Sequence, residues 1–313
     1  MWGFLRLARR QLEPRRVGGD VPGLPPGAEL GHQWWRVAVV GDVGHPSPEL
    51  DATVSSLVHA STDRRFDALV LLGDNVYPDG HPALLQQAVL DPFAPLLDAG
   101  VPLLAVLGNH DVQASHGDEI ARLLGMPGRW YATTFGPALF VALDSTQPDC
   151  PAQRAWLVAT LAETRATWVI VALHHPPYSA GWHGSERRVR RAFVPLFRRF
   201  GVDIVLAGHE HDYQRSKPVA GTTYVISGAA AHLRSTGRAR FTAASRATHH
   251  FLDLRISPSR LELVAVNHGG IAFDGLVLSP RCRETPGHVA AVAAPREGQP
   301  RRAFRRGGRT SAT

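Results

Sequence analysis

Side chains of the kinds that bind transition metals recur at five places in this sequence, each at the end of a short apolar run. The clusters are GDVG (41–44), GDNVY (73–77), GNHD (108–111), LHH (173–175) and GHEH (208–211). They offer carboxylates, a phenol, an amide oxygen and imidazoles, a mixed oxygen and nitrogen set that suits iron, zinc or manganese better than calcium. The candidate ligands are Asp42, Asp74, Tyr77, Asn109, His110, Asp111, His174, His175, His209 and His211.

This set is too large for a single ion. One catalytic metal needs three or four protein ligands and an open position, whereas these side chains could fill two shells that share a carboxylate. Two metals about 3.5–4 Å apart form a clamp for in-line displacement at phosphorus, in which one activates a water and both neutralise charge. The residues therefore favour hydrolysis of a small phosphate ester by metal-activated hydroxide.

The elements around the clusters explain how residues so far apart in sequence could meet. The apolar runs predict buried parallel strands, and the stretches between several of them predict helices, as in βαβ units. The strands would span 36–44, 68–77, 102–111, 168–176 and 203–211, and the helices about 49–62, 82–98, 152–165 and 186–200. Proteins with such sheets bind their small molecules beyond the carboxyl ends of the strands, where all five clusters would lie.

Later stretches lack long helices between them and predict antiparallel strands in a second sheet packed on the first. They span 222–228, 249–256, 260–266 and 271–278. One further requirement concerns His209 and His211, which alternate along an extended segment and would point to opposite faces. The chain must bend there to bring both imidazoles inward.

Length and charge divide the chain into three parts. The 313 residues, 44% of them apolar, suffice for one large α/β domain. The net charge of +7 is concentrated at the ends, so we expect a basic flexible arm at 1–33, a folded domain at 34–280 and a basic disordered tail at 281–313. The tail contains Phe304 as its sole aromatic residue, so no specific nucleic-acid partner is expected.

Cysteine usage and hydropathy bound the compartment. Cys150 and Cys282 are the only cysteines and lie far apart, which excludes a disulfide-built fold. No stretch approaches 18 uninterrupted apolar residues, so no membrane association is expected. The first sixteen residues hold arginines at 6, 9 and 10 and no signal-type apolar segment, which favours a cytoplasmic protein and leaves export open. The sequence does not predict an oligomeric state.

The blocks GDVG, GDNVY, GNHD, VALH and GHEH, in this order, resemble the five motifs of the calcineurin-like metallophosphoesterases. Most of that superfamily carries a histidine at the position of Gly44. The glycine there, together with Tyr77, resembles the purple acid phosphatase branch. The resemblance covers about residues 35–230 and implies an α/β sandwich of two facing mixed β-sheets flanked by helices.

The resemblance also implies a ligand set for two metals. Asp42, Asp74, Tyr77 and His211 would hold the first, and Asp74 would bridge to the second. The remaining ligands of the second would be Asn109, His174 and His209. A tyrosinate ligand favours Fe(III) at the first position, because a phenol with a pKa near 10 ionises at neutral pH only beside a strongly Lewis-acidic ion. The second metal would be Fe(II), Zn or Mn.

Other residues receive catalytic or binding roles from the resemblance. His110 would contact the substrate phosphate or protonate the leaving alkoxide, and His183 would lie near the cleft. Asp111 could orient His110 through a hydrogen bond. Arg215 could reach a phosphate or simply pair with an acid. The motif leaves His175 without a defined role.

Three other functions are compatible with the same residues. A cyclic-nucleotide or other phosphodiesterase would use the same metals, and an inactive metal-binding scaffold would keep the ligands alone. An enzyme directed at nucleic acid would need the basic ends. Substrate specificity would come from loops such as 112–135 and 229–247, which carry no recognised motif.

Overall fold

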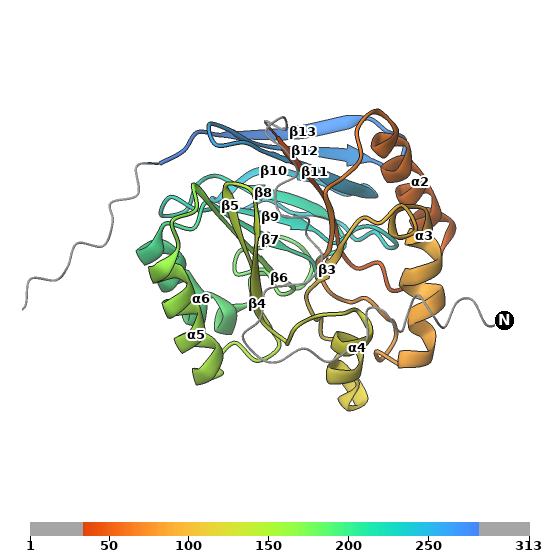
Figure 1. Cartoon of the computed structure of the whole chain (residues 1–313), viewed down its shortest axis with the longest axis horizontal. Helices are drawn as coiled ribbons and strands as arrows, with labels where there is room; N and C mark the ends of the chain where they lie inside the picture. The colour runs from red at the N-terminus through yellow and green to blue at the C-terminus, as the bar shows by residue number, and fades with distance from the viewer. Residues whose placement is uncertain (1–33, 282–313) are drawn as a thin grey trace, which may run out of the picture. The chain divides into compact units, whose positions relative to one another are not determined.

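Two mixed β-sheets form the centre of the chain (Figure 1). The computed structural model describes residues 34–281, so the expected arm at 1–33 and all of the expected tail except Arg281 lie outside the described residues. None of the helices within 34–281 is both long and apolar enough to cross a membrane. The predicted architecture, two mixed sheets flanked by helices, is confirmed.

The first sheet has six strands and joins the beginning of the domain to its end. Its order is β13 (Ala272–Leu278), β12 (Leu261–Asn267), β11 (His250–Ile256), β1 (Trp35–Val40), β2 (Ala68–Leu71) and β3 (Leu103–Ala105). β1, β2 and β3 are parallel, whereas β11 pairs antiparallel with β1 and continues into β12 and β13. The carboxyl ends of the first three apolar runs therefore lie along one edge.

The second sheet has seven strands. Its order is β10 (Thr242–Arg246), β8 (Tyr213–Ser216), β9 (Thr223–Ser227), β7 (Ile204–Ala207), β6 (Trp168–Leu173), β5 (Ala138–Ala142) and β4 (Tyr131–Phe135). β5, β6, β7 and β9 are parallel, and the outer strands pair antiparallel. The fourth and fifth apolar runs lie in this sheet as β6 and β7.

The expectation of one mainly parallel sheet and one antiparallel sheet is thus wrong in its distribution of strands. Three of the five predicted parallel strands lie in one sheet and two in the other, and β11 to β13 extend the first sheet instead of forming a separate one. Apolar runs show that a strand is buried, but they do not show which neighbour it pairs with. The loops expected at 112–135 and 229–247 also contain regular structure, namely α4 (Gly117–Leu123), β4 and β10.

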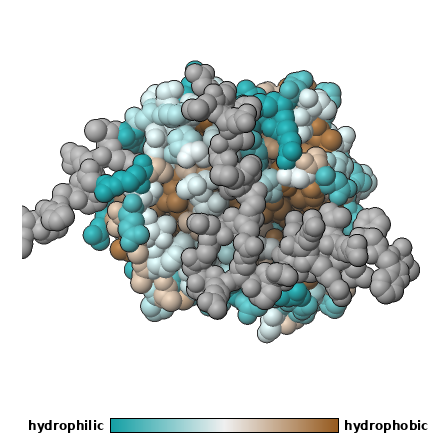
Figure 2. Space-filling view, viewed as in Figure 1, coloured by the Kyte–Doolittle hydropathy of each residue, from teal (hydrophilic) through white to brown (hydrophobic). Residues whose placement is uncertain are grey.

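Helices cover the outer face of each sheet. α2 (Pro48–Asp63) and α3 (Asp91–Leu97) pack on the first sheet, and α5 (Pro151–Glu163) and α6 (Arg187–Phe200) on the second. The helix predicted over 82–98 is broken into a 3₁₀ turn, Pro82–Leu84, a π-helical segment, Gln86–Leu90, and α3. A further 3₁₀ turn, Gln113–Ser115, precedes α4. In Figure 2 hydrophilic surface prevails toward the margins of the face drawn, with hydrophobic patches near its middle.

The strands alternate between two packing environments. In β1, Val37 and Val39 point into the layer between the sheets, while Ala38 and Val40 face the helices. This alternation is the period-two pattern of a strand buried on both faces. The layers fix the strands rigidly, so the loops at their carboxyl ends are held in place.

Candidate metal centre

Two buried aspartates lie at the carboxyl ends of neighbouring parallel strands. Asp42 follows β1 and Asp74 follows β2, and both have backbone φ in the left-handed region, at 57° and 51°. Their carboxylates tie other loops to this edge. Asp42 accepts a hydrogen bond from the amide of His209 at 2.9 Å, and Asp74 accepts one from the amide of His110 at 2.9 Å. The first two clusters therefore hold the third and the fifth in place.

The bend required between His209 and His211 is present. His209 has φ of 70°, a left-handed conformation that turns the chain directly after β7. As a result His209 Nδ1 lies 3.3 Å from His174 Nε2, and His211 Nε2 lies 3.4 Å from Asp42 Oδ1. Both imidazoles face the centre.

The Tyr77 hydroxyl is surrounded by three of the predicted ligands. It lies 3.1 Å from Asp74 Oδ2, 3.2 Å from His211 Nε2 and 3.3 Å from Asp42 Oδ1. A phenol has one hydrogen to donate, so it can serve only one of the two carboxylate oxygens that it contacts. Burial and the two carboxylates raise the pKa of Tyr77, whereas burial also raises the pKa of Asp42. This donor set fits a cation, which would stabilise the charged forms of all three oxygens.

A second group of atoms converges on His174. Its Nδ1 faces the Leu72 carbonyl at 2.8 Å and donates a hydrogen bond to it. In the neutral ring, Nε2 therefore carries the lone pair that could bind a metal. That Nε2 lies 3.1 Å from Asn109 Oδ1 and 3.3 Å from Asp74 Oδ2. Burial opposes the charged form of His174, but the carboxylate of Asp74 outweighs it and raises the pKa of His174 to about 9. In the metal-free protein, Nε2 therefore holds a proton at the position where a metal ion would bind.

The seven predicted ligands are therefore brought together by the fold. Asp74 lies between two subsets, since its Oδ2 contacts both Tyr77 and His174. One subset is Asp42, Tyr77 and His211, and the other is Asn109, His174 and His209. Burial opposes the charge of Asp74, but the adjacent His174 outweighs it and lowers the pKa of that carboxyl below its usual range.

Gly44 explains why a histidine cannot stand where most of the superfamily carries one. Its amide donates to the Asp74 carbonyl at 3.0 Å, and its carbonyl accepts from the Tyr77 amide at 3.1 Å. A Cβ at this position would lie 2.5 Å from the amide nitrogen of Val76. The loop that carries Tyr77 thus occupies the space that a side chain at position 44 would need.

The predicted link between Asp111 and His110 is wrong. The buried Asp111 carboxylate accepts hydrogen bonds from the amides of Asn75, Val76 and Gly108 and from the Asn75 side chain, at 2.8–3.0 Å. The His110 ring instead contacts the Pro78 carbonyl through Nδ1 at 2.5 Å and lies beside Tyr77, with ring centres 4.4 Å apart. Asp111 clamps two ligand loops together, because four inward N–H groups surround it.

His183 and Arg215 have different surroundings. The ring of His183 lies beside His209, with centres 4.4 Å apart, so this histidine does lie at the centre. Arg215 forms a two-point ion pair with Asp274 at 2.7 and 2.9 Å. Of the two expectations for Arg215, the structure has the pairing with an acid.

Several neighbours of the centre were not predicted. Arg234 NH1 lies 2.6 Å from His183 Nε2, and the buried Glu210 accepts from the amides of His183 and Gly184 at 3.0 and 2.8 Å. His232 stacks on His211, with ring centres 5.6 Å apart. Arg234 and His232 lie in the segment 229–247, which has no motif, so no sequence signal points to them. Glu210 could have been found from its place inside GHEH.

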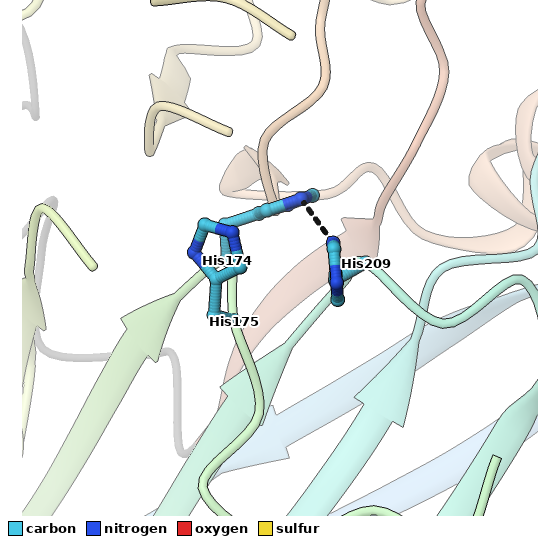
Figure 3. A group of neighbouring side chains, drawn as sticks. All are labelled: His174, His175 and His209. Carbon is cyan, nitrogen blue, oxygen red and sulfur yellow. Dashed lines mark hydrogen bonds between the residues drawn. The ribbon is translucent and has the colours of Figure 1, made fainter. Parts of the chain in front are cut away.

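His175 also lies at the centre. One ring nitrogen from each of His174, His175 and His209 falls within 4.8 Å of the others, and Asp42, Asp74 and His174 form a second such group. Figure 3 shows His174 and His209 joined by their contact, with the ring of His175 alongside. The motif left this residue undefined, whereas the structure places its ring beside those of the predicted ligands His174 and His209.

With this geometry, comparison with known proteins defines the class. The model of the calcineurin-like phosphoesterase family matches residues 36–213, more than half of the chain. The chain belongs to this family and is a phosphate-ester hydrolase.

Its relatives include acid phosphatases. Tartrate-resistant acid phosphatase type 5 of Homo sapiens is 27% identical over 271 residues, which cover 73% of this chain and 79% of that protein. Purple acid phosphatase 21 of Arabidopsis thaliana is 30% identical over 206 residues, covering 58% of this chain and 45% of that protein. The solved purple acid phosphatase PPD1 from yellow lupin seeds has the same fold, with a TM-score of 0.72, 20% identity and coverage of 79% and 54%.

Proposed function

We propose that this protein is a dinuclear metallohydrolase of the purple acid phosphatase type that cleaves a small phosphate ester. The observation that carries the proposal is the convergence of seven side chains in two subsets that meet at Asp74 Oδ2. Carboxylate, phenol, amide and imidazole atoms lie 3.1–3.4 Å from one another there, a mixed oxygen and nitrogen set that suits cations.

The two subsets would divide the metals between them. Asp42, Tyr77 and His211 would hold one, and Asp74 would bridge to the second. The other ligands of that second ion would be Asn109, His174 and His209. When bound, the pair would supply an activated hydroxide and neutralise charge on the transferring phosphoryl group.

Protein groups on both sides of this centre would bind and orient the ester. His110 lies on the Tyr77 side, and its contact with the Pro78 carbonyl fixes the ring and leaves the other nitrogen for the leaving oxygen. His183 lies on the His209 side, next to the guanidinium of Arg234. The positive charge of Arg234 suits a phosphate dianion. We therefore assign phosphate binding to Arg234 and not to Arg215, because Arg215 is paired with Asp274.

The test is Asp74→Ala, with exposed Asp51→Ala as the matched control. Removing the shared carboxylate should lower bound metal from about two ions per chain to one or none and reduce hydrolysis of p-nitrophenyl phosphate at least a thousandfold. Metal analysis and kinetics on that monoester and on bis(p-nitrophenyl) phosphate check this, and circular dichroism checks folding. A folded Asp74→Ala protein with full metal content and activity would refute the proposal.

The trivalent iron is a separate part of the proposal, supported by Tyr77. Burial and the neighbouring carboxylates raise the pKa of this phenol, so ligation requires an ion of strong Lewis acidity. Iron-loaded protein should therefore show a visible absorption band that disappears or shifts in Tyr77→Phe and stays unchanged in Tyr178→Phe. A colourless, active, iron-free protein would leave the dinuclear hydrolase standing and remove the iron.

A further inference from the structure

His175 lies at the metal centre but has no part in the function proposed above. It directly follows His174 at the end of β6, and its ring is edge-on to that of His174 and beside that of His209, with centres 4.9 and 4.6 Å apart. Proximity alone would make it an eighth metal ligand, because its ring nitrogen lies within 4.8 Å of the ligand atoms of the other two (Figure 3).

The buried hydroxyl of Ser145 decides which nitrogen of His175 carries the hydrogen. Ser145 Oγ accepts hydrogen bonds from the amides of His174 and His175, at 3.1 and 2.9 Å. A hydroxyl has two acceptor lone pairs and one hydrogen, so both lone pairs are used. The hydrogen of Ser145 therefore points to its third neighbour, His175 Nδ1, at 2.9 Å. Nδ1 accepts this hydrogen, and in the neutral ring Nε2 carries the other one.

This tautomer excludes His175 as a metal ligand. Nδ1 has given its lone pair to Ser145, and Nε2 presents a hydrogen instead of a lone pair. His174 has the opposite arrangement, because its Nδ1 donates to the Leu72 carbonyl and frees Nε2. The Leu72 carbonyl and the Ser145 hydroxyl thus favour opposite tautomers in two adjacent histidines. His174 can bind a metal through Nε2, whereas His175 can donate a hydrogen bond from Nε2.

The Nε2–H of His175 is an available donor. Within residues 34–281 the His175 ring meets both the hydroxyl and the main-chain carbonyl of Ser145, and the hydrogen bond to the hydroxyl is made by Nδ1. Nε2 is not among the buried atoms without a partner. On this side of the centre the ring lies next to His209, which in turn packs against His183. A donor on this ring would lie among His174, His209 and His183, the side chains that border the proposed phosphate site.

We propose that His175 is a substrate-binding residue that donates Nε2–H to a nonbridging oxygen of the phosphoryl group, and that Ser145 is the positioning residue that fixes its tautomer. The inference rests on the proposed function, because the phosphoryl group is placed by the metal centre. His175 would be a neutral hydrogen-bond donor beside His174 and His209, and the charged Arg234 beside His183 would be a second group that binds the phosphate.

The tautomer can be measured without metal or substrate. Nitrogen-15 NMR of the full-length, metal-free protein should show His175 with protonated Nε2 and unprotonated Nδ1, the signals being identified by their loss in His175→Phe. Ser145→Ala should produce a mixture of tautomers. A wild-type ring with protonated Nδ1 would overturn the proposal.

The role toward substrate is tested with inorganic phosphate on metal-loaded protein. His175→Phe should keep full metal content and raise the inhibition constant for phosphate about tenfold, because one hydrogen bond to an anion is lost. His175→Gln, which keeps an N–H donor, should recover most of that loss. Ser145→Ala should weaken phosphate binding several-fold. The double variant Ser145→Ala, His175→Phe should bind phosphate no more weakly than His175→Phe alone. Exposed His59→Phe serves as the control.

The outcomes separate this inference from the function itself. Loss of metal in His175→Phe would make the residue a ligand, and an unchanged inhibition constant would make it structural; either result overturns the inference and leaves the hydrolase intact. A wild-type protein that holds metal but neither binds phosphate nor hydrolyses the ester would overturn both.

Discussion

At the scale of the residue, the centre is built on backbone conformations that most residues avoid. Asp42, Asp74 and His209 have positive φ, which costs a non-glycine residue of the order of 1–3 kcal/mol. The cost is offset where the strained residues hold one another, since the amide of His209 donates to the Asp42 carboxylate. The strain aims side chains from separate strands at one point.

Asp111 shows how a residue inside a ligand motif can serve the fold. Asp111→Ala would leave four buried N–H groups without their acceptor, so we expect a loss of about 3 kcal/mol or more in the free energy of unfolding. Urea denaturation of the metal-free protein measures this. His110→Ala is the contrast, because it removes a half-buried ring and should cost under about 1 kcal/mol while lowering turnover. An Asp111→Ala protein of normal stability but low turnover would restore the orienting role.

At the scale of the element, the loops after β1 and β2 are packed too closely for an added side chain. Gly44→Ala would place a Cβ 2.5 Å from the Val76 amide and push the Tyr77 loop away. We expect a loss of about 2–3 kcal/mol in unfolding free energy and weaker metal retention. Gly184→Ala is the contrast: Gly184 has a positive φ, which Gly44 does not, and nothing lies within 4 Å of the added Cβ, so about 1 kcal/mol should be lost through backbone conformation alone.

The result of that comparison discriminates close approach from backbone strain. Thermal unfolding and metal analysis of both variants provide it. A loss in Gly44→Ala no larger than that in Gly184→Ala would contradict the prediction, because the close contact with Val76 would then cost no more than backbone strain in open space. Normal metal retention in Gly44→Ala would show that the Tyr77 loop can move aside at no cost to the centre.

The same elements show what sequence could and could not predict. The convergence of the seven predicted ligands could be foreseen because each cluster ends an apolar strand, and parallel strands end at one edge. The assignment of strands to sheets could not, since β11 pairs with β1 across more than 200 residues and no local pattern records that choice. Asp111 was misassigned for a related reason: its partners, Asn75 and Val76, belong to a distant cluster that meets it only after folding.

At the scale of the whole molecule, the net charge does not describe the site. The +7 arises from the arginine-rich segments 1–33 and 282–313, and residues 34–281 contain equal numbers of basic and acidic residues. Attraction of a phosphate must therefore come from local groups such as Arg234 and the proposed cations, within a Debye length of about 10 Å at 0.1 M salt.

Stability of the whole domain should depend on pH through His250, a fully buried residue of β11. Its Nδ1 donates to the Thr248 carbonyl, its Nε2 has no hydrogen-bond partner among residues 34–281, and its ring meets Tyr213 and Phe273 edge-on. Burial lowers the pKa of His250 to about 4, while in the unfolded chain it is about 6.5. Between these values the unfolded chain binds the extra proton, so stability is full above pH 6.5 and is lost as pH falls toward 4.

This difference amounts to about 2 kcal/mol between pH 7 and pH 5. His250→Phe keeps an aromatic ring against Tyr213 and Phe273 and removes the titration, and the lost bond to Thr248 is common to both pH values. Urea denaturation at the two pH values should therefore show a smaller pH-dependent loss in His250→Phe than in wild type, by about that amount. Exposed His59→Phe should behave like wild type. If His250→Phe keeps the wild-type dependence, the acid sensitivity of the fold lies in the carboxylates and imidazoles of the metal centre instead.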